Sequence, residues 1–413
     1  MTADRPPTPR SRGYQITLVA LLSLTFGIVF FDRNALNFLM PFVQPDLGLS
    51  NTEIGFLAAI LASTWALSGF VVGSISDRIG RRKPILILAT LVFACASLLS
   101  GLAASFAMLL GARLLMGVAE GGVMPVSQSI LASEIDPGRR GAAMGFMQNF
   151  GSNFLGTSLA PVMLIPIAAA YGWRSALYVA AVPGILCAIL LWRFVDEPRQ
   201  VPHEGAPAAL GALLRDRNVI ICTVMSIFFI SYLITGLVFL PVVLTQMRGL
   251  DASTMGWLIG AMGLAAAISG FVIPAISDRV GRRPVLLIVP YLGVIVPLAT
   301  LFFVGSAAAL AAVLVTGWLV IGAFPVFLAT VPSETVAPRQ VATTLGLIQG
   351  VGEAFGGVAA PALAGVAADA FGLQAPMWIM VGLALAAGLT AIGLRETAPR
   401  VQAKRSAMKA AHG

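Results

Sequence analysis

Long apolar runs separated by short polar segments dominate this sequence. An α-helix needs roughly 20 apolar residues to cross a hydrocarbon core of about 30 Å, and transmembrane strands alternate too weakly to produce such runs. The pattern therefore predicts an all-α polytopic membrane protein with twelve transmembrane helices. The expected helices cover residues 14–41, 54–75, 84–104, 107–131, 142–168, 174–195, 219–247, 252–276, 284–305, 307–331, 342–368 and 376–394.

The basic residues alternate between the two sides of these helices. Apart from Arg33 and Arg113 inside helices, and Arg174 and Arg248 beside alternate loops, the 26 lysines and arginines lie at the N-terminus, in the even-numbered loops, at the centre and in the C-terminal tail. Cytoplasmic loops carry the excess of basic residues. We therefore expect a multi-pass protein of the cytoplasmic (inner) membrane with both termini in the cytoplasm.

Composition agrees with this class of protein. Charged residues make up 11% of the chain, compared with about 25% in soluble domains. The net charge of +8 follows from the placement of the basic loops, so we expect contact with membrane lipid and no binding of nucleic acid.

A charged heptapeptide occurs twice in the chain. Ser76–Arg82 reads SDRIGRR and Ser277–Arg283 reads SDRVGRR, 201 positions apart, and each copy lies between two apolar runs. Two similar halves in tandem are typical of carriers that rock one half against the other. The expected boundaries are 1–195 for the N-terminal six-helix half, 196–218 for a cytoplasmic linker, 219–394 for the C-terminal six-helix half and 395–413 for a basic tail.

Each repeated hairpin contains an aspartate as well as arginines. Loop charges that only set topology would not require an acidic residue at the same place in both halves. A helix N-terminus attracts a carboxylate, so each aspartate is placed to cap a helix of the opposite half while the arginines meet a glutamate. We interpret the hairpins as a cytoplasmic gate. The expected gate residues are Asp77, Arg78, Arg81, Glu134, Asp278, Arg279, Arg282 and Glu334.

Five charged residues lie in the interior of the expected helices, away from their ends: Asp32, Arg33, Arg113, Glu120 and Glu353. Such a group costs about 2.5–3.5 kcal/mol or more at bilayer depth, so it should face a partner or a water-filled cavity. One explanation is a structural salt-bridge network between the first and fourth helices. The other is a transport site, because arginine binds a substrate carboxylate with a planar fork. Substrate would then release a paired carboxylate and favour its protonation.

Four softer candidates for the substrate cavity are Gln148 and Asn149 in the fifth helix, Tyr232 in the seventh and Gln349 in the eleventh. Amides inside membranes often join helices, and buried aromatic residues often belong to the core, so each candidate has a purely structural alternative. Glu353 is expected to act as a second proton site or as a hydrogen-bonding group for substrate.

Two motifs resemble those of the major facilitator superfamily: the segment Gly73–Lys83 between the second and third helices, and Arg113-x-x-x-Gly117 in the fourth. The pair Asp32–Arg33, together with Arg113-x6-Glu120, resembles the anion:cation symporter branch of that superfamily, which includes sugar-acid/proton symporters and sialic acid carriers. The resemblance implies that Asp32 and Glu120 couple protons, and that Arg33 and Arg113 bind the anion and form the charge network.

We therefore expect a secondary active transporter that imports a small organic anion, such as a sugar acid or another monocarboxylate, together with protons by alternating access. A drug/proton antiporter and an electrophoretic anion carrier are the alternatives. A membrane sensor would need a soluble signalling domain, for which the chain has no room. Uptake into vesicles with and without a proton gradient separates these classes.

Enzymatic and metal chemistry have little support. The two histidines, His203 and His412, lie in a loop and in the tail, so no histidine cluster can hold a metal. No lysine follows a glycine-rich phosphate-binding loop. We expect no enzyme, no cofactor and a monomer. Cys95, Cys187 and Cys222 fall in apolar runs and are expected to be buried thiols without a disulfide.

Overall fold

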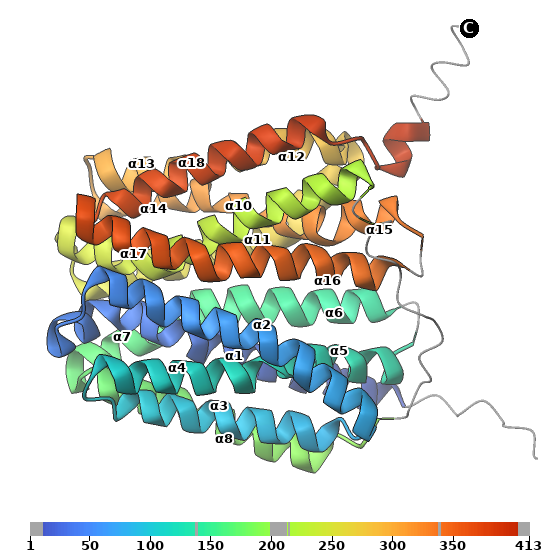
Figure 1. Ribbon diagram of the computed structural model, residues 1–413, viewed down its shortest axis with the longest axis horizontal. Coiled ribbons are helices and arrows are strands. Elements are labelled where there is room, and N and C mark those ends of the chain that lie inside the picture. The colour runs from blue at the N-terminus through green and yellow to red at the C-terminus, as the bar shows by residue number, and fades with distance from the viewer. Residues whose placement is uncertain (1–10, 137–138, 199–212, 214, 338–339, 404–413) are drawn as a thin grey trace, which may run out of the picture.

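The computed structural model describes residues 11–136, 139–198, 213, 215–337 and 340–403. It is almost entirely helical and, within these residues, has twelve helical segments long and apolar enough to cross a membrane, which confirms the prediction of an all-α membrane protein (Figure 1). His203, His412, most of the linker and the end of the basic tail lie outside the described residues.

The first six spans form the N-terminal half. Their helices are α1 (Arg12–Leu47), α2 (Asn51–Ile79), α3 (Lys83–Gly101), α4 (Phe106–Gly121), α5 (Val123–Glu134), α6 (Arg140–Asn149), the π-helical segment η2 (Phe150–Leu159), α7 (Ala160–Tyr171) and α8 (Trp173–Phe194). The fourth span consists of α4 and α5, and the fifth of α6, η2 and α7.

The last six spans form the C-terminal half. They contain α10 (Arg217–Val242), η3 (Val243–Met247), α11 (Ala252–Val280), α12 (Arg282–Leu292), α13 (Ile295–Phe302), α14 (Ala307–Trp318), η4 (Leu319–Ala323), η5 (Val326–Thr330), α15 (Val331–Thr335), α16 (Val341–Gly352), η7 (Glu353–Ala359), α17 (Ala360–Phe371), α18 (Ala375–Thr390) and η8 (Ala391–Gly393). The fifth and eleventh spans both contain a π-helical segment, so the repeat seen in the sequence extends to this distortion.

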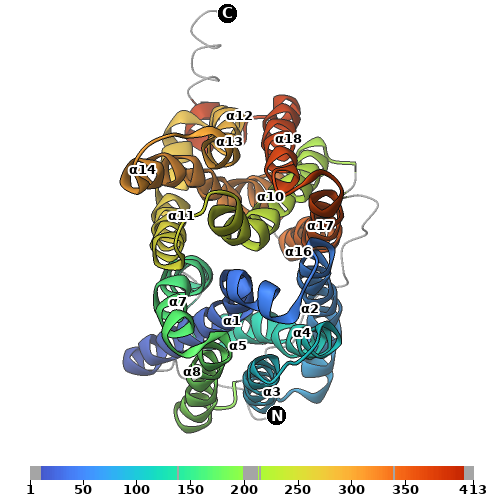
Figure 2. The same ribbon diagram turned by 90° about the vertical axis from the view of Figure 1, so that its left-hand side faces the viewer.

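Polar residues fix where several helices begin. Ser50 and Glu53 form a capping box at the start of α2, and Asp251 accepts hydrogen bonds at the start of α11. These side chains satisfy backbone N–H groups that have no partner inside the helix. The two halves lie side by side, with their helices nearly parallel to the long axis of the molecule (Figure 2).

Helix α4 packs against α2 through two glycines one turn apart. A Cβ atom at Gly117 would lie against the Thr64 hydroxyl and the Leu61 carbonyl, and a Cβ at Gly121 would lie against the Trp65 carbonyl. Only a glycine surface allows two backbones to approach so closely. This contact fixes α4 against α2 and thereby positions the two charged residues of α4.

The two halves contact each other mainly near the end of the molecule that is opposite to the repeated hairpins. A Cβ at Gly55 of α2 would lie against the Pro361 carbonyl, and a Cβ at Gly263 of α11 would lie 2.5 Å from the Ser158 backbone nitrogen. Helix α2 packs on η7 and α17, and α11 packs on η2 and α7. The structure is therefore closed at this end, which we call the outer end.

Hydrogen bonds join the halves at the outer end as well. Asp369 at the end of α17 accepts bonds from the backbone N–H groups of Asn51 (3.0 Å) and Thr52 (2.7 Å) at the start of α2, and from both of their side chains. Gln246 donates its amide to Gln44 across the same interface at 2.8 Å. A carboxylate at a helix N-terminus also interacts favourably with the helix dipole.

The second hairpin makes its described ion pairs within its own half. Arg282 is buried and pairs with Asp278 (2.5 Å) and Glu334 (2.9 Å), and its backbone N–H donates to Glu396. Glu396 thereby caps the start of α12. The equivalent carboxylate of the first half is Glu197, which accepts bonds from the start of α3.

The structure corrects the assignment of the gate arginine in the first half. Arg81 was expected to correspond to Arg282, but Arg81 is exposed and Arg82 occupies the buried position whose N–H meets Glu197. The reason is that three residues separate α2 from α3, whereas a single residue separates α11 from α12, so α3 begins later in its hairpin than α12 does. Arg78 and Arg279 are exposed, Glu134 is buried, and the side chain of Asp77 lies outside the described part of the chain.

The expectation of three buried thiols is wrong for one residue. Cys187 and Cys222 are buried, but Cys95 on α3 is exposed on the outside of the bundle. Apolar composition alone does not distinguish a residue that faces lipid from one that faces another helix.

Candidate functional site

A cavity in the middle of the molecule collects polar side chains from the first and fourth spans. Arginines 33 and 113 line it, together with Asn34 and Asn37 of α1. The remaining walls are apolar and are contributed by Leu36 of α1, by Leu57, Ala58, Leu61 and Ala62 of α2, and by Ile234 and Val238 of α10. Both halves therefore contribute to this space, which we call the central cavity.

Arg33 presents its guanidinium to the central cavity from α1. The group lies over the ring of Trp65 on α2, with 5.3 Å between the guanidinium carbon and the ring centroid. Such a contact orients an arginine without using its N–H donors. Among the described contacts, no hydrogen bond occupies the N–H donors of Arg33, so they remain for a ligand in the cavity. Asn37 follows four residues later and lies on the same face of α1.

Arg113 joins α4 to α1 and also reaches the central cavity. It is 2% exposed, and its Nη1 donates to the backbone carbonyl of Arg33 at 2.9 Å. Its Nε and Nη2 are buried and, within the described residues, have no hydrogen-bond partner. A buried cation with unpaired N–H donors is energetically unfavourable, and an anion that accepts hydrogen bonds from these donors would remove that cost.

Asp32 does not line the central cavity. It is fully buried on the other side of α1, where it accepts a hydrogen bond from Ser97 of α3. Ser97 also contacts the carbonyl of Leu177 on α8 at 3.3 Å. Arg113 lies within Coulombic range of Asp32 without forming a direct ion pair with it among the described contacts.

Glu120 is buried in α4, and neither of its carboxylate oxygens has a hydrogen-bond partner within the described residues. Arg33, Asp32 and Arg113 all lie within Coulombic range of it. The four charges are thus close, but among the described ion pairs they do not form the closed salt-bridge network that was one of the two explanations. An open arrangement leaves each group able to exchange partners.

Glu353 belongs to this charge group although it lies in the other half. It begins η7, accepts a hydrogen bond from Gln349 at 3.0 Å and has a second oxygen that is buried without a partner among the described residues. Arg33 lies within Coulombic range of Glu353. From the sequence this carboxylate lacked an obvious arginine; the fold supplies one from the opposite half.

Asn149 connects the halves. Its amide donates to the carbonyl of Ala267 on α11 at 2.9 Å, and its oxygen accepts a bond from Asn153 at 2.7 Å. The adjacent Gln148 is half-buried and is not among the residues that line the central cavity. Asn149 therefore links two helices, which was the structural alternative to a role in substrate binding.

Tyr232 was expected to line the substrate cavity, and the structure places it elsewhere. It is buried inside the C-terminal half, where its hydroxyl donates to the carbonyl of Gly293 at 2.8 Å and its ring packs near Trp318. The tyrosine therefore faces α12 and α14 and does not reach the central cavity.

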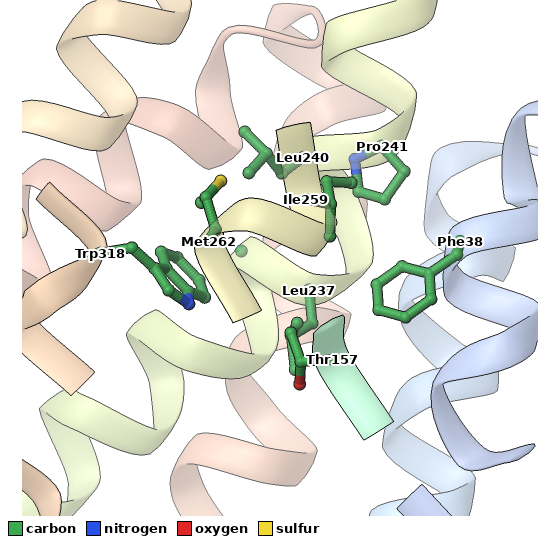
Figure 3. A pocket seen from close by; sticks show the side chains of 9 residues that line it. Phe38, Thr157, Leu237, Leu240, Pro241, Ile259, Met262 and Trp318 are labelled. Carbon is green, nitrogen blue, oxygen red and sulfur yellow. The ribbon is translucent and has the colours of Figure 1, made fainter. Parts of the chain in front are cut away.

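A second, apolar cavity lies beside the central one. Figure 3 shows its lining, in which Phe38 approaches from α1 and Trp318 from the C-terminal half. Thr157 of η2 supplies the one hydroxyl among the residues that line it. The remaining lining residues are Gly236, Leu237, Leu240, Pro241, Ile259 and Met262.

Sequence reasoning missed four residues of the site: Asn34, Asn37, Trp65 and Ser97. The two asparagines carry a signal, because Asn34 is adjacent to Arg33 and Asn37 lies one turn from it in a mostly apolar span. The contacts of Trp65 and Ser97 depend on which helices pack against α1, and no local pattern reveals that.

Twelve spans in two similar halves around a central charged cavity define a membrane carrier. The chain belongs to the Major Facilitator Superfamily, whose family model matches residues 22–349 and 225–412. It is a multi-pass membrane transporter and not an enzyme.

The names of similar proteins agree with this class. The chain is 29% identical over 290 residues to the hexuronate transporter of Bacillus subtilis, covering 66% of this chain and 67% of that one. It is 30% identical over 338 residues to a protein of Cupriavidus pinatubonensis named "probable 4-methylmuconolactone transporter", covering 79% and 78%. A bacterial homolog of the human lysosomal transporter Spinster, solved in an inward-facing and occupied conformation, has the same fold, with a TM-score of 0.77, 20% identity and coverage of 93% and 95%.

Proposed function

We propose that this protein imports a small organic anion, such as a sugar acid or another monocarboxylate, together with protons. The observation that carries the proposal is the central cavity, where Arg33 and Arg113 meet while buried carboxylates lie within Coulombic range. Guanidinium groups with unpaired donors fit a carboxylate. The hexuronate transporter among its relatives supports an organic anion as substrate.

Proton coupling would follow from competition for the arginines. A buried carboxylate is stabilised either by a nearby cation or by a proton. When a substrate carboxylate engages Arg33 and Arg113, Glu120 loses part of that stabilisation and takes up a proton instead. Anion and proton then favour each other's binding by the same free energy, which is the thermodynamic requirement for symport.

Alternating access would use the two ends of the molecule in turn. With the basic hairpins in the cytoplasm, the closed outer end makes this the inward-facing state of a protein of the inner membrane. In the outward-facing state the contacts of Asp369 break, and the hairpin residues Asp77 and Asp278 cap helices of the opposite half. This exchange of contacts moves the opening of the central cavity from one side to the other.

A transport assay tests the proposal directly. Purified protein in proteoliposomes is expected to accumulate radiolabelled glucuronate or benzoate only when a proton gradient is imposed in the direction of uptake, and to lose that accumulation when a protonophore is added. Accumulation driven by membrane potential alone would indicate an electrophoretic anion carrier. Proton-driven expulsion of a cationic dye without anion uptake would support the drug antiporter instead.

Replacing Asp369 with asparagine is expected to open the outer end. The asparagine amide carries no negative charge, so it accepts the two backbone N–H bonds of α2 less strongly than the carboxylate does. The inward-facing state should therefore lose about 1 kcal/mol relative to the outward-facing state, which shifts the equilibrium between them about fivefold. Spin labels at Tyr171 and Phe371, which are 78% and 76% exposed at the outer ends of the two halves, report the change as a longer distance. The exposed Cys95 is first replaced with serine.

The matched control for Asp369 is Asp251. It also caps a helix at the outer end, but it bonds to Thr254 of its own half at 2.9 Å. Hydrogen bonds from the side chain and the backbone of Thr254 keep the pKa of the Asp251 carboxyl below its usual value, so the group stays ionised at neutral pH. Asp251→Asn should leave the label distance unchanged. Equal distances in Asp369→Asn and the unmodified protein would show that the carboxylate does not hold the halves together.

A further inference from the structure

The lining of the central cavity limits the chemistry of the molecule that can occupy it. Four of its residues have polar side chains, and two of these are arginines, which donate hydrogen bonds and accept none. The amide nitrogen of Asn34 is engaged with the Gly156 carbonyl of η2 at 3.3 Å. Asn37 alone therefore keeps both its donor and its acceptor groups for a ligand, since no described contact occupies its amide.

A polyhydroxylated ligand has poor partners in such a space. Each hydroxyl is a donor as well as an acceptor, so several hydroxyls require several acceptors on the protein. The side chains that complete the walls, from α2 and α10, are leucine, alanine, isoleucine and valine. An apolar wall disfavours each added hydroxyl by roughly tenfold to a hundredfold in binding.

The neighbouring apolar cavity extends this environment. Consecutive residues line the two cavities on both α1 and α10: Asn37 and Phe38 on the first, and Leu237 and Val238 on the second. Figure 3 shows Phe38 on one side of the apolar cavity and Trp318 on the other. Aromatic faces and aliphatic chains fit the body of an apolar ring, whereas the arginines fit its carboxylate.

We infer that the transported anion is a monocarboxylate with an apolar ring or short hydrocarbon body and few hydroxyls, and not a sugar acid. The inference rests on the proposed function, which supplies the carboxylate at the arginines. It deepens that function, because the apolar lining decides among anions that would all satisfy the same guanidinium groups.

A matched set of ligands tests the apolar body of the substrate separately from the proposed anion transport. Cyclohexanecarboxylate and glucuronate both carry one carboxylate on a six-membered ring and differ mainly in ring hydroxyls, whereas cyclohexanecarboxamide has the apolar ring without the charge. Binding to the purified full-length protein is measured by the rise in melting temperature over a concentration series. Cyclohexanecarboxylate is expected to bind at least about tenfold more tightly than glucuronate.

Each outcome has a distinct meaning. Glucuronate binding as tightly as cyclohexanecarboxylate, or more tightly, overturns the inference and leaves the anion transporter in place. Equal binding of the carboxamide and the carboxylate overturns the role of the arginines and so the proposed function itself. A lack of any effect of cyclohexanecarboxylate at about 10 mM, well above a Kd of about 1 mM, also overturns the inference.

A substitution in the wall gives a second test. Val238→Thr adds a hydroxyl with little change of shape, so it should weaken cyclohexanecarboxylate binding about threefold to tenfold and improve the relative binding of glucuronate. Val272→Thr on α11 is the control, because Val272 is exposed on the outside of the bundle and should change neither affinity. Identical ligand preference in Val238→Thr and the unmodified protein would contradict the placement of the ligand body against α10.

Discussion

Replacement of Arg33 by alanine is expected to weaken carboxylate binding by about 30-fold or more, corresponding to about 2 kcal/mol. The substitution removes a guanidinium that faces the central cavity and stacks on Trp65. It preserves the link between α4 and α1, because Arg113 donates to the backbone carbonyl of residue 33 and not to its side chain. The variant therefore separates anion binding from helix packing. Isothermal titration with cyclohexanecarboxylate and glucuronate measures the loss.

Two further arginine variants complete the comparison. Arg113→Ala should lose binding to a similar extent and also lower the melting temperature of the ligand-free protein, because the α4–α1 hydrogen bond disappears. Arg174→Ala is the control, since Arg174 pairs with Asp46 on an exposed surface at 2.7 Å and such pairs contribute little. Unchanged affinity in both Arg33→Ala and Arg113→Ala would remove the anion site from the central cavity.

Replacement of Glu120 by glutamine is expected to abolish proton-driven accumulation while retaining exchange of substrate across the membrane. The amide has the same shape as the carboxyl group but cannot release a proton, so the cycle loses its coupled step. Both oxygens of Glu120 are buried without a described partner, so the neutral side chain should not lower the melting temperature. Uptake with a gradient and counterflow without one are measured in the same proteoliposomes.

The coupling test needs a carboxylate that is outside the charge group. Glu53 belongs to the capping box of α2, so Glu53→Gln should keep proton-driven accumulation. Asp32→Asn and Glu353→Gln then show whether those carboxylates share the role. If Glu120→Gln accumulates substrate as the unmodified protein does, protons are coupled elsewhere or not at all.

Much of the fold could be predicted from the sequence because its signals are local. An apolar run long enough to cross a membrane identifies itself, and the repeated hairpins identify the two halves. Arg113 and Glu120 could be placed on one face because helical spacing fixes it. Asp32 and Arg33 are adjacent, so they point to different sides of α1, and only the packing of α3 and α2 shows which residue meets which neighbour.

The sequence-based predictions were wrong where helix packing or the register of a helix end determines which way a side chain faces. The same apolar composition surrounds Cys95, which faces outward, and Tyr232, which faces the interior of its half. A two-residue difference in where α3 and α12 begin after their hairpins changed which arginine of the first hairpin is buried. Glu353 could not be paired with Arg33 from the sequence, because the two residues belong to different halves and meet only in the folded molecule.

The central cavity takes all of its polar lining from one half of the chain and part of its apolar wall from the other. The arginines and asparagines are on helices of the first half, and Ile234 and Val238 of α10 are on the second. Substitutions on α10 can therefore change the shape and polarity of the cavity while the arginines and asparagines stay in place. The ligand preference of the cavity can thus evolve through a few mutations in one helix of the second half, with the charged residues of the first half unchanged.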